Sequence, residues 1–219
     1  MKNRYIVLIF LIVMYIIFVV FKRKSIFLTS KEIETFYDGM KKVDTVLQEH
    51  NIPYFVICGT LLGVARHQEI IPWDDDIDIA IFDKDVDRFM SIDFSKYGYE
   101  TYAINRDNEN CCGKIFLDKD KKLWIDVFPF EKVDDKYRYK EDRARKIWPK
   151  EYLYEEELFP LKKYKFGKIE VYCPNNIIPY CERAWGKNGW KKCPVKVSKF
   201  ISDPITSIRM LFTKTKPIS

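Results

Sequence analysis

The sequence has few glycines and prolines, and acidic residues are nearly missing from the two ends of the chain. With 8 glycines and 10 prolines among 219 residues, it contains no collagen-like or low-complexity segment. No acid occurs in residues 1–24 and only Asp203 in residues 190–219, so both ends are strongly basic, while the segment between them is acidic on balance and the whole chain has a net charge of +6. A double-stranded DNA-binding protein usually carries its basic stripe on the folded body. We therefore expect no nucleic-acid partner.

The six cysteines lack the spacing of a common zinc motif. No C-x-x-C pair occurs, which argues against a zinc ribbon. Cys58 lies in an apolar run and is expected to be a small buried hydrophobic residue. A disulfide among Cys173, Cys181 and Cys193 stays open as an alternative if the folded part is lumenal. There is also no Asn-x-Ser/Thr sequon, so glycosylation does not indicate the compartment.

The segment from Tyr5 to Phe21 contains no charge, glycine or proline. As a helix it would be about 25 Å long at ~1.5 Å per residue, which is adequate for a thin bilayer. Aromatic residues lie at both ends, basic residues 22–24 follow, and residues 25–28 offer no small-x-small cleavage site. We therefore predict a retained transmembrane anchor in residues 1–24. The expected protein is single-pass, with the bilayer as a partner and its soluble domain on the lumenal side of the ER or Golgi.

The remaining chain predicts one α+β domain in residues 25–189 and a basic tail in residues 190–219. Thr29 and Glu32 have the spacing of a capping box. Apolar residues then recur at three-and-four spacing, which predicts an amphipathic helix to about Glu49. The other expected elements are strands at 54–58, 76–82, 100–105, 114–117, 123–128, 165–166 and 169–172, and helices at 60–66, 85–90, 139–147 and 176–185.

Three acidic residues on two predicted strands are candidates for a metal site. Asp76 and Asp78 are two residues apart in an alternating strand, so their side chains emerge on one face. Asp126 is a lone acid in the apolar run Trp-Ile-Asp-Val-Phe, where burial without a partner would be costly. If the two strands pair, the three carboxylates meet, and they repel one another unless a cation lies between them. Oxygen-only ligands with open positions suit Mg²⁺ or Mn²⁺ bound together with a phosphate.

An acidic run can also be a solvated surface loop. For Asp74 and Asp75 both interpretations stay open. For Asp76 and Asp78 the isoleucines between and after them favour a buried strand. A calcium-binding EF-hand loop is excluded, because the sixth position counted from Asp74 is not glycine.

Gly59 and Thr60 follow a predicted strand and open a predicted helix. Backbone N–H groups at such a position can bind phosphate oxygens. Arg66, further along the same helix, can donate two hydrogen bonds to a phosphate. Lys114 can neutralise phosphate charge, although the simpler interpretation is a surface lysine that contacts no substrate. Phosphate on the turn and metal on the strand form an arrangement of the nucleotidyltransferase type.

These motifs closely resemble the signature of the LicD family, which includes bacterial phosphocholine transferases, fukutin and fukutin-related protein. The resemblance rests on GTLLGVARH at residues 59–67 and IPWDDDIDI at residues 71–79. The segment WIDVFP at residues 124–129 resembles the third-carboxylate segment of the family. Phe159-Pro160-Leu161-Lys162, Gly167, Pro174 and Trp185-Gly186 resemble its C-terminal elements. The resemblance covers about residues 35–190.

The resemblance implies a nucleotidyltransferase-like mixed sheet with flanking helices. It also implies metal-dependent transfer of a phospho-alcohol from a CDP-activated donor to a hydroxyl of a glycan or glycoprotein, with release of CMP. The residues assigned to Mg²⁺ or Mn²⁺ and to catalysis are Asp76, Asp78 and Asp126, and those assigned to the substrate are Gly59, Thr60, Arg66 and Lys114. Two alternatives stay open: a glycosyltransferase that uses Asp-x-Asp and a nucleotide sugar, and a catalytically inactive membrane scaffold.

Overall fold

The computed structural model describes residues 14, 27–102, 113–192, 210 and 212–218. The chain divides into two compact units, one of residues 1–27 and 193–214 and one of residues 28–192 and 215–219. Of the first unit, only residues 14, 27, 210 and 212–214 are described. The helices, strands and sites that follow all belong to the second unit.

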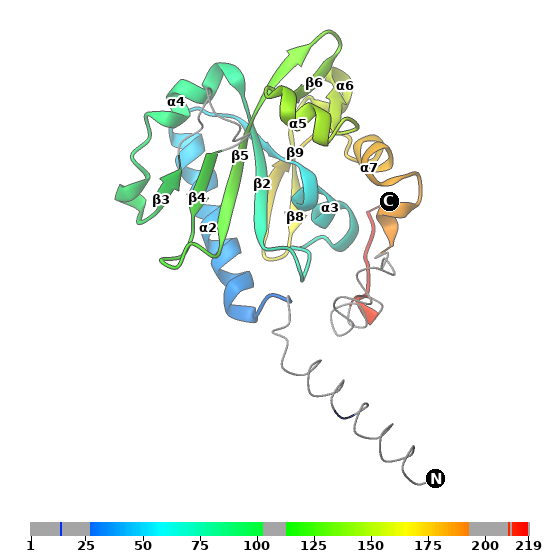
Figure 1. Cartoon of the computed structure of the whole chain (residues 1–219), viewed down its shortest axis with the longest axis horizontal. Helices are drawn as coiled ribbons and strands as arrows, with labels where there is room; N and C mark the ends of the chain where they lie inside the picture. The colour runs from blue at the N-terminus through cyan, green and yellow to red at the C-terminus, as the bar shows by residue number, and fades with distance from the viewer. Residues whose placement is uncertain (1–13, 15–26, 103–112, 193–209, 211, 219) are drawn as a thin grey trace, which may run out of the picture. The chain divides into compact units, whose positions relative to one another are not determined.

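A mixed sheet forms the centre of this unit (Figure 1). Its main path runs in the order β1-β2-β5-β4-β3, β6 also pairs with β5, and β7 pairs with β6. β2 and β5 are parallel, and the other pairs are antiparallel. The strands are β1 (Tyr54–Val56), β2 (Asp76–Phe82), β3 (Glu100–Tyr102), β4 (Gly113–Phe116), β5 (Trp124–Val133), β6 (Lys136–Tyr139) and β7 (Tyr152–Tyr154).

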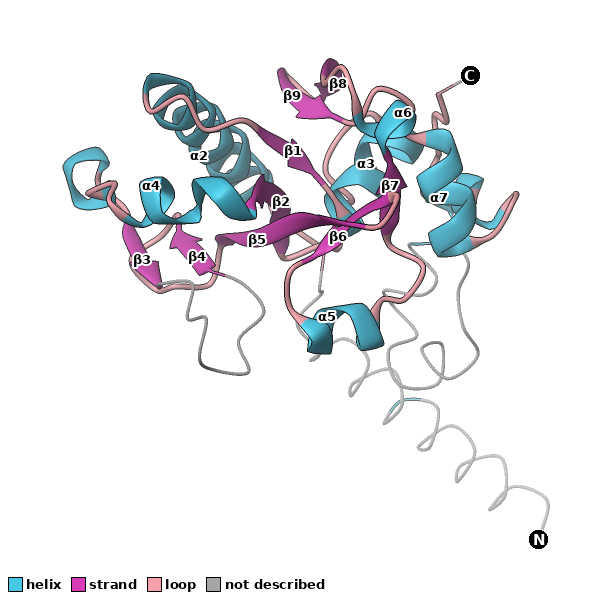
Figure 2. Cartoon of the chain, turned by 90° about the horizontal axis from the view of Figure 1, so that it is seen from above, coloured by secondary structure: helices cyan, strands magenta, loops and turns pink. Residues whose placement is uncertain are grey.

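Helices cover both faces of the sheet, as Figures 1 and 2 show, with α2 on one face and α5 on the other. The predicted capping box is confirmed at the start of α2, where the Thr29 and Glu32 side chains each accept a hydrogen bond from the other residue's backbone N–H. The helices are α2 (Ser30–Glu49), α3 (Cys58–His67), α4 (Val86–Met90), α5 (Asp142–Ile147), α6 (Glu155–Leu158) and α7 (Ile178–Trp185), with 3₁₀ turns η1 (Asp83–Asp85), η2 (Phe94–Tyr97) and η3 (Gly189–Lys191).

A separate two-stranded hairpin, β8 (Lys162–Phe166) with β9 (Ile169–Cys173), packs against α2. Its turn contains Gly167, which has a φ of +61° and lies so close to Tyr37 that an added Cβ would be 2.2 Å from the tyrosine ring. The N–H of Gly167 also donates to the carbonyl of Gln68 at 2.7 Å. Because glycine has no side chain, the hairpin can pack closely against Tyr37 of α2.

Two local predictions need correction. The predicted helix at 139–147 begins only at Asp142, because Tyr139 ends strand β6 and pairs with Phe130 of β5. Tyr139 is 1% exposed, and its ring centroid lies 4.7 Å from that of Phe130, so pairing with β5 and burial outweigh the local helical pattern. The strand predicted at 54–58 ends at Val56, and Cys58 is instead the first residue of α3.

The predicted localisation is contradicted. Within the described part of the chain, no helix combines the length and the apolar character needed to cross a membrane. The predicted anchor in residues 1–24 lies outside the described residues except for Met14. Among the cysteines considered for a disulfide, Cys173 and Cys181 are buried free thiols, and Cys193 lies outside the described residues.

Candidate active site

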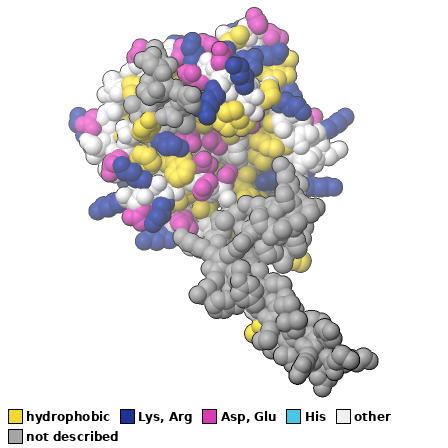
Figure 3. All heavy atoms as spheres, viewed as in Figure 1, with side chains coloured by type: hydrophobic (Ala, Val, Ile, Leu, Met, Phe, Trp, Pro, Cys, Tyr) yellow, Lys and Arg dark blue, Asp and Glu magenta, His cyan; other side chains and the backbone are white. Residues whose placement is uncertain are grey.

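The parallel pairing of β2 and β5 brings the three predicted carboxylates together. Asp78 and Asp126 are direct partners in the register, and Asp76 is paired with Trp124, so all three side chains emerge on the α5 face of the sheet. One oxygen of each carboxylate lies within 4.8 Å of the others. Asp78 and Asp126 are only 8% and 7% exposed. Figure 3 shows acidic side chains near the middle of this face, with apolar side chains on either side.

Burial and mutual repulsion disfavour the charged form of these carboxylates. Burial, followed by the charge of Asp126, raises the pKa of Asp76 to about 6. Burial and the neighbouring carboxylates, Asp76 first among them, raise the pKa of Asp78 well above its ordinary value. The metal-free cluster therefore keeps protons that exposed carboxyls would have lost, and a cation bound between the carboxylates would balance the negative charge of their ionised forms.

Lys114 partly balances this charge. Its ammonium lies 2.6 Å from an oxygen of Asp126 and 4.4 Å from the centroid of the Trp124 ring. The antiparallel register pairs Lys114 with Asp126, which places the lysine at the edge of the carboxylate cluster. The ammonium of Lys114 therefore lies beside the carboxylates, and its contact with a substrate phosphate stays a prediction.

The donor set fits a hard divalent cation. Asp76, Asp78 and Asp126 supply only oxygen atoms, and they come from two adjacent rigid strands. Mg²⁺ and Mn²⁺ prefer carboxylate ligands and usually keep other positions for water and phosphate oxygens. A second acidic group, Asp74, Asp75 and Asp76, also brings its oxygens within 4.8 Å of one another and shares Asp76 with the first.

Asp74 is the residue at this site for which the sequence left both a solvated loop and a metal site open. The structure places its half-buried carboxylate against the first turn of α3, where a Cβ added to Gly59 would lie 2.6 Å from Oδ2 of Asp74. Burial, followed by the charges of Asp76 and Asp75, raises the pKa of Asp74 to about 7. The signal in the sequence was the period-two spacing of Asp74, Asp76 and Asp78, because it continues the alternation of the strand backwards by one step.

The predicted phosphate-binding turn lies directly beside Asp78. The hydroxyl of Thr60 accepts a hydrogen bond from the backbone N–H of Asp78 at 2.8 Å, and the N–H of Ile57 donates to the Asp78 carbonyl at 3.1 Å. No side chain caps the N-terminus of α3 at its N-cap residue, Ile57. Gly59 and Thr60 are thus brought to the carboxylates, as expected, and their contact with phosphate stays a prediction.

Arg66 lies at the other end of α3. Its guanidinium is buried, donating from Nη1 to the Lys192 carbonyl at 3.0 Å and from Nε to Nδ1 of His67 at 3.3 Å. Burial and the charge of Arg66 lower the pKa of His67 to about 4, so His67 is neutral at pH 7 and can accept that bond. Arg66 therefore makes hydrogen bonds within the fold, and its role as a phosphate ligand stays a prediction.

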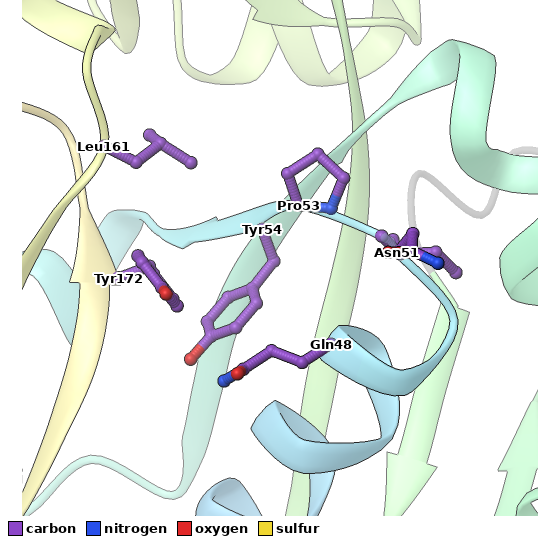
Figure 4. Close-up of a pocket in the computed structure, with 7 residues that line it drawn as sticks. Gln48, Asn51, Pro53, Tyr54, Leu161 and Tyr172 are labelled. Carbon is purple, nitrogen blue, oxygen red and sulfur yellow. The ribbon is translucent and has the colours of Figure 1, made fainter.

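A cavity of about 480 Å³ on another part of this unit contains none of the predicted site residues. In Figure 4, Tyr54 of β1 and Tyr172 of β9 lie beside Gln48 at the end of α2. The Tyr54 hydroxyl donates a hydrogen bond to Oδ1 of Asp44 at 2.9 Å. The candidate active site is therefore the carboxylate cluster rather than this cavity.

Comparison with known proteins identifies the family. The model of the LicD/FKTN/FKRP nucleotidyltransferase domain matches residues 51–176. An uncharacterised protein of Rickettsia prowazekii is 37% identical over 75% of this chain and 58% of its own length. The ribitol 5-phosphate transferase FKRP of Homo sapiens is 26% identical over 64% of this chain and 29% of its own.

A shorter match has a different named activity. The lipopolysaccharide cholinephosphotransferase LicD of Haemophilus influenzae is 38% identical over 25% of this chain and 22% of its own length. Among solved structures, ANT(2")-Ia in complex with adenylyl-2"-tobramycin aligns with 78% of this chain and 84% of its own, at 13% identity and a TM-score of 0.45. The chain spans 58% or less of each of these curated relatives. Because the family model covers more than half of the sequence and includes all three carboxylates, the chain belongs to the LicD/FKTN/FKRP family and contains its nucleotidyltransferase domain.

Proposed function

We propose that this chain is a metal-dependent phosphotransferase that moves a phosphocholine-like or phosphoribitol-like group from a CDP-activated donor to a hydroxyl of a glycan or glycoprotein. The observation that carries the proposal is the convergence of Asp76, Asp78 and Asp126 within 4.8 Å beside the first turn of α3. The named activities of the relatives, ribitol 5-phosphate transfer and choline-phosphate transfer, support this substrate class.

In the proposed reaction, the acceptor oxygen attacks the phosphorus that bears the alcohol, and the bond from that phosphorus to CMP breaks. Asp76, Asp78 and Asp126 would hold Mg²⁺ or Mn²⁺, which supplies neutralisation of the charge on the diphosphate and on the leaving CMP. Lys114 and the N–H groups of the α3 turn orient the phosphates, and Asp126 either completes the ligand set or accepts the hydroxyl proton. Catalysis then consists mainly of positioning and electrostatics.

The test is incubation of the purified full chain with CDP-choline, CDP-ribitol and CDP-glycerol, each with Mn²⁺ and a glycan acceptor. We expect CMP release with at least one donor and a phosphodiester-linked product, both lost when EDTA is added. Release of a nucleoside diphosphate from a nucleotide sugar, with a plain glycosidic product, would support the glycosyltransferase alternative. Lack of turnover together with lack of Mn²⁺ binding in calorimetry would support an inactive scaffold.

Stability and metal binding should depend on pH in opposite directions. The pKa values of Asp76 and Asp74 are about 6 and about 7 in the folded chain, whereas both carboxyls titrate near 3.8 when unperturbed. Between these values the folded state binds more protons than the unfolded state, so the stability of the metal-free protein falls as the pH rises from 4 to 7. Mn²⁺ must displace the same protons, so its affinity weakens by about tenfold per pH unit for each displaced proton below pH 6.

Thermal melts from pH 5 to pH 8, with and without Mn²⁺, measure both effects. We expect the melting temperature of the metal-free chain to fall across this range and the shift caused by Mn²⁺ to grow. A Mn²⁺-induced shift that is largest at pH 5 would contradict the assignment of these carboxylates as metal ligands.

A further inference from the structure

A partly buried hydrogen-bond cluster, which we call the Glu151 cluster, consists of Cys58, Tyr139, Glu151 and Tyr180. One carboxylate oxygen of Glu151 accepts hydrogen bonds from the hydroxyl of Tyr139 at 2.6 Å, the hydroxyl of Tyr180 at 3.0 Å and the thiol of Cys58 at 3.2 Å. The tyrosines come from β6 and α7, and they are 1% and 0% exposed. Four segments that are distant in the sequence therefore meet at one carboxylate.

The cluster holds Cys58 in an unusual backbone conformation. Cys58 has a φ of +47°, in the left-handed region that residues carrying a Cβ rarely adopt. Its N–H donates to the hydroxyl of Tyr180 at 3.3 Å, and its sulfur contacts the hydroxyl of Tyr139 at 2.9 Å as well as Glu151. Such a conformation persists only where the surroundings enforce it, which is typical of functional sites. Both ends of this residue, main chain and side chain, are held by the cluster.

The three groups that surround the carboxylate stay protonated at neutral pH. Burial raises the pKa of the Cys58 thiol and those of the Tyr139 and Tyr180 hydroxyls well above their ordinary values. Each is therefore a neutral donor, and the Glu151 oxygen is occupied by them. This arrangement argues against a nucleophilic Cys58 and for a structural use of the carboxylate.

Cys58 immediately precedes the turn that faces the carboxylates. Its backbone conformation sets the direction in which the N–H groups of Gly59 and Thr60 point at the start of α3. The hydroxyl of Thr60 in turn accepts a hydrogen bond from the N–H of Asp78. We propose that Glu151 is a positioning residue that acts through Cys58, Tyr139 and Tyr180 to aim the first turn of α3 at the phosphates of the donor. This inference rests on the proposed function, because it assigns a supporting residue to the same site.

The variants Glu151→Gln, Glu151→Ala and Tyr180→Phe test the inference in the full chain. Glutamine keeps an acceptor oxygen, alanine removes it, and phenylalanine removes only the hydroxyl that joins the backbone N–H of Cys58 to Glu151. We expect the KM for the CDP-alcohol to rise about tenfold or more in Glu151→Ala and Tyr180→Phe, with partial rescue in Glu151→Gln. The Mn²⁺ affinity should change by less than about twofold, because none of the three carboxylate ligands is altered.

Tyr164→Phe is the matched control, since its hydroxyl makes a 3.0 Å bond to the Asn175 carbonyl elsewhere in the same unit. It should lower the melting temperature without changing the KM. Amide hydrogen exchange of Gly59 and Thr60 gives a readout that does not depend on activity, and exchange should be faster in Tyr180→Phe than in Tyr164→Phe.

The two proposals fail in different ways. A wild-type chain that binds Mn²⁺ but releases no CMP from any donor would overturn the proposed function. An active wild type whose KM and amide exchange are unchanged in folded Tyr180→Phe and Glu151→Ala would overturn only the role of Glu151.

Discussion

Replacing Asp78 by asparagine should abolish transfer while leaving the metal-free protein at least as stable as the wild type. Asp78 is central to the carboxylate cluster, and the substitution removes the charge of a proposed metal ligand from a buried site. CMP release should fall by at least ~100-fold, and Mn²⁺ binding should weaken in calorimetry. The hydrogen bonds to Thr60 and Ile57 involve the backbone of Asp78, so the substitution leaves them in place.

The stability result has a separate cause. Burial and the neighbouring acids raise the pKa of Asp78, which means that the ionised form of this carboxyl destabilises the folded chain. Asparagine has nearly the same shape and no charge, so the melting temperature without metal should not fall. Asp135→Asn is the control, because it removes the same charge from an exposed side chain in the turn between β5 and β6. Wild-type CMP release in Asp78→Asn would refute the proposed mechanism.

Replacing Gly167 by alanine should lower the free energy of unfolding by several kcal/mol, although the substitution adds only one methyl group. The left-handed φ costs about 1–2 kcal/mol for alanine, and overlap with Tyr37 adds about 1–3 kcal/mol. Tyr37 cannot easily yield, because its ring packs edge-on against Phe166 and its hydroxyl accepts a bond from the N–H of Ile70. A total of about 2–5 kcal/mol corresponds to a melting temperature lower by roughly 4–20 °C.

Gly98 provides the matched control for this prediction. It has a φ of +84° at the end of η2, but an added Cβ would meet no atom within 4 Å. Gly98→Ala therefore reports the cost of the backbone conformation alone, and the difference between the two variants measures the contact with Tyr37. Equal losses of melting temperature in the two variants would show that the hairpin does not depend on this close approach.

The local pattern of the sequence was sufficient for much of the candidate site. Alternation placed Asp76 and Asp78 on one face, and the lone acid in an apolar strand marked Asp126 as a partner. The capping box at Thr29 also followed from spacing alone. Each of these features depends on residues within a few positions of one another, where the period of a strand or a helix determines the direction of a side chain.

Other features could not be read from short-range patterns. Tyr139 was expected in a helix, but its pairing with Phe130 across the β5–β6 hairpin makes it a strand residue. Asp74 was left undecided, because its burial depends on the approach of Gly59. Glu151 drew no prediction, since its role requires contacts with groups 29 and 93 positions away in the chain.

The sequence by itself therefore determined which residues carry the proposed chemistry, that they share a face of the sheet, and to which family the chain is similar. The tertiary structure decided how deeply the carboxylates are buried, which groups surround them and what holds the adjacent turn in its strained conformation. The physical reason is that backbone periodicity is local, whereas burial and hydrogen bonding between side chains depend on how distant segments pack.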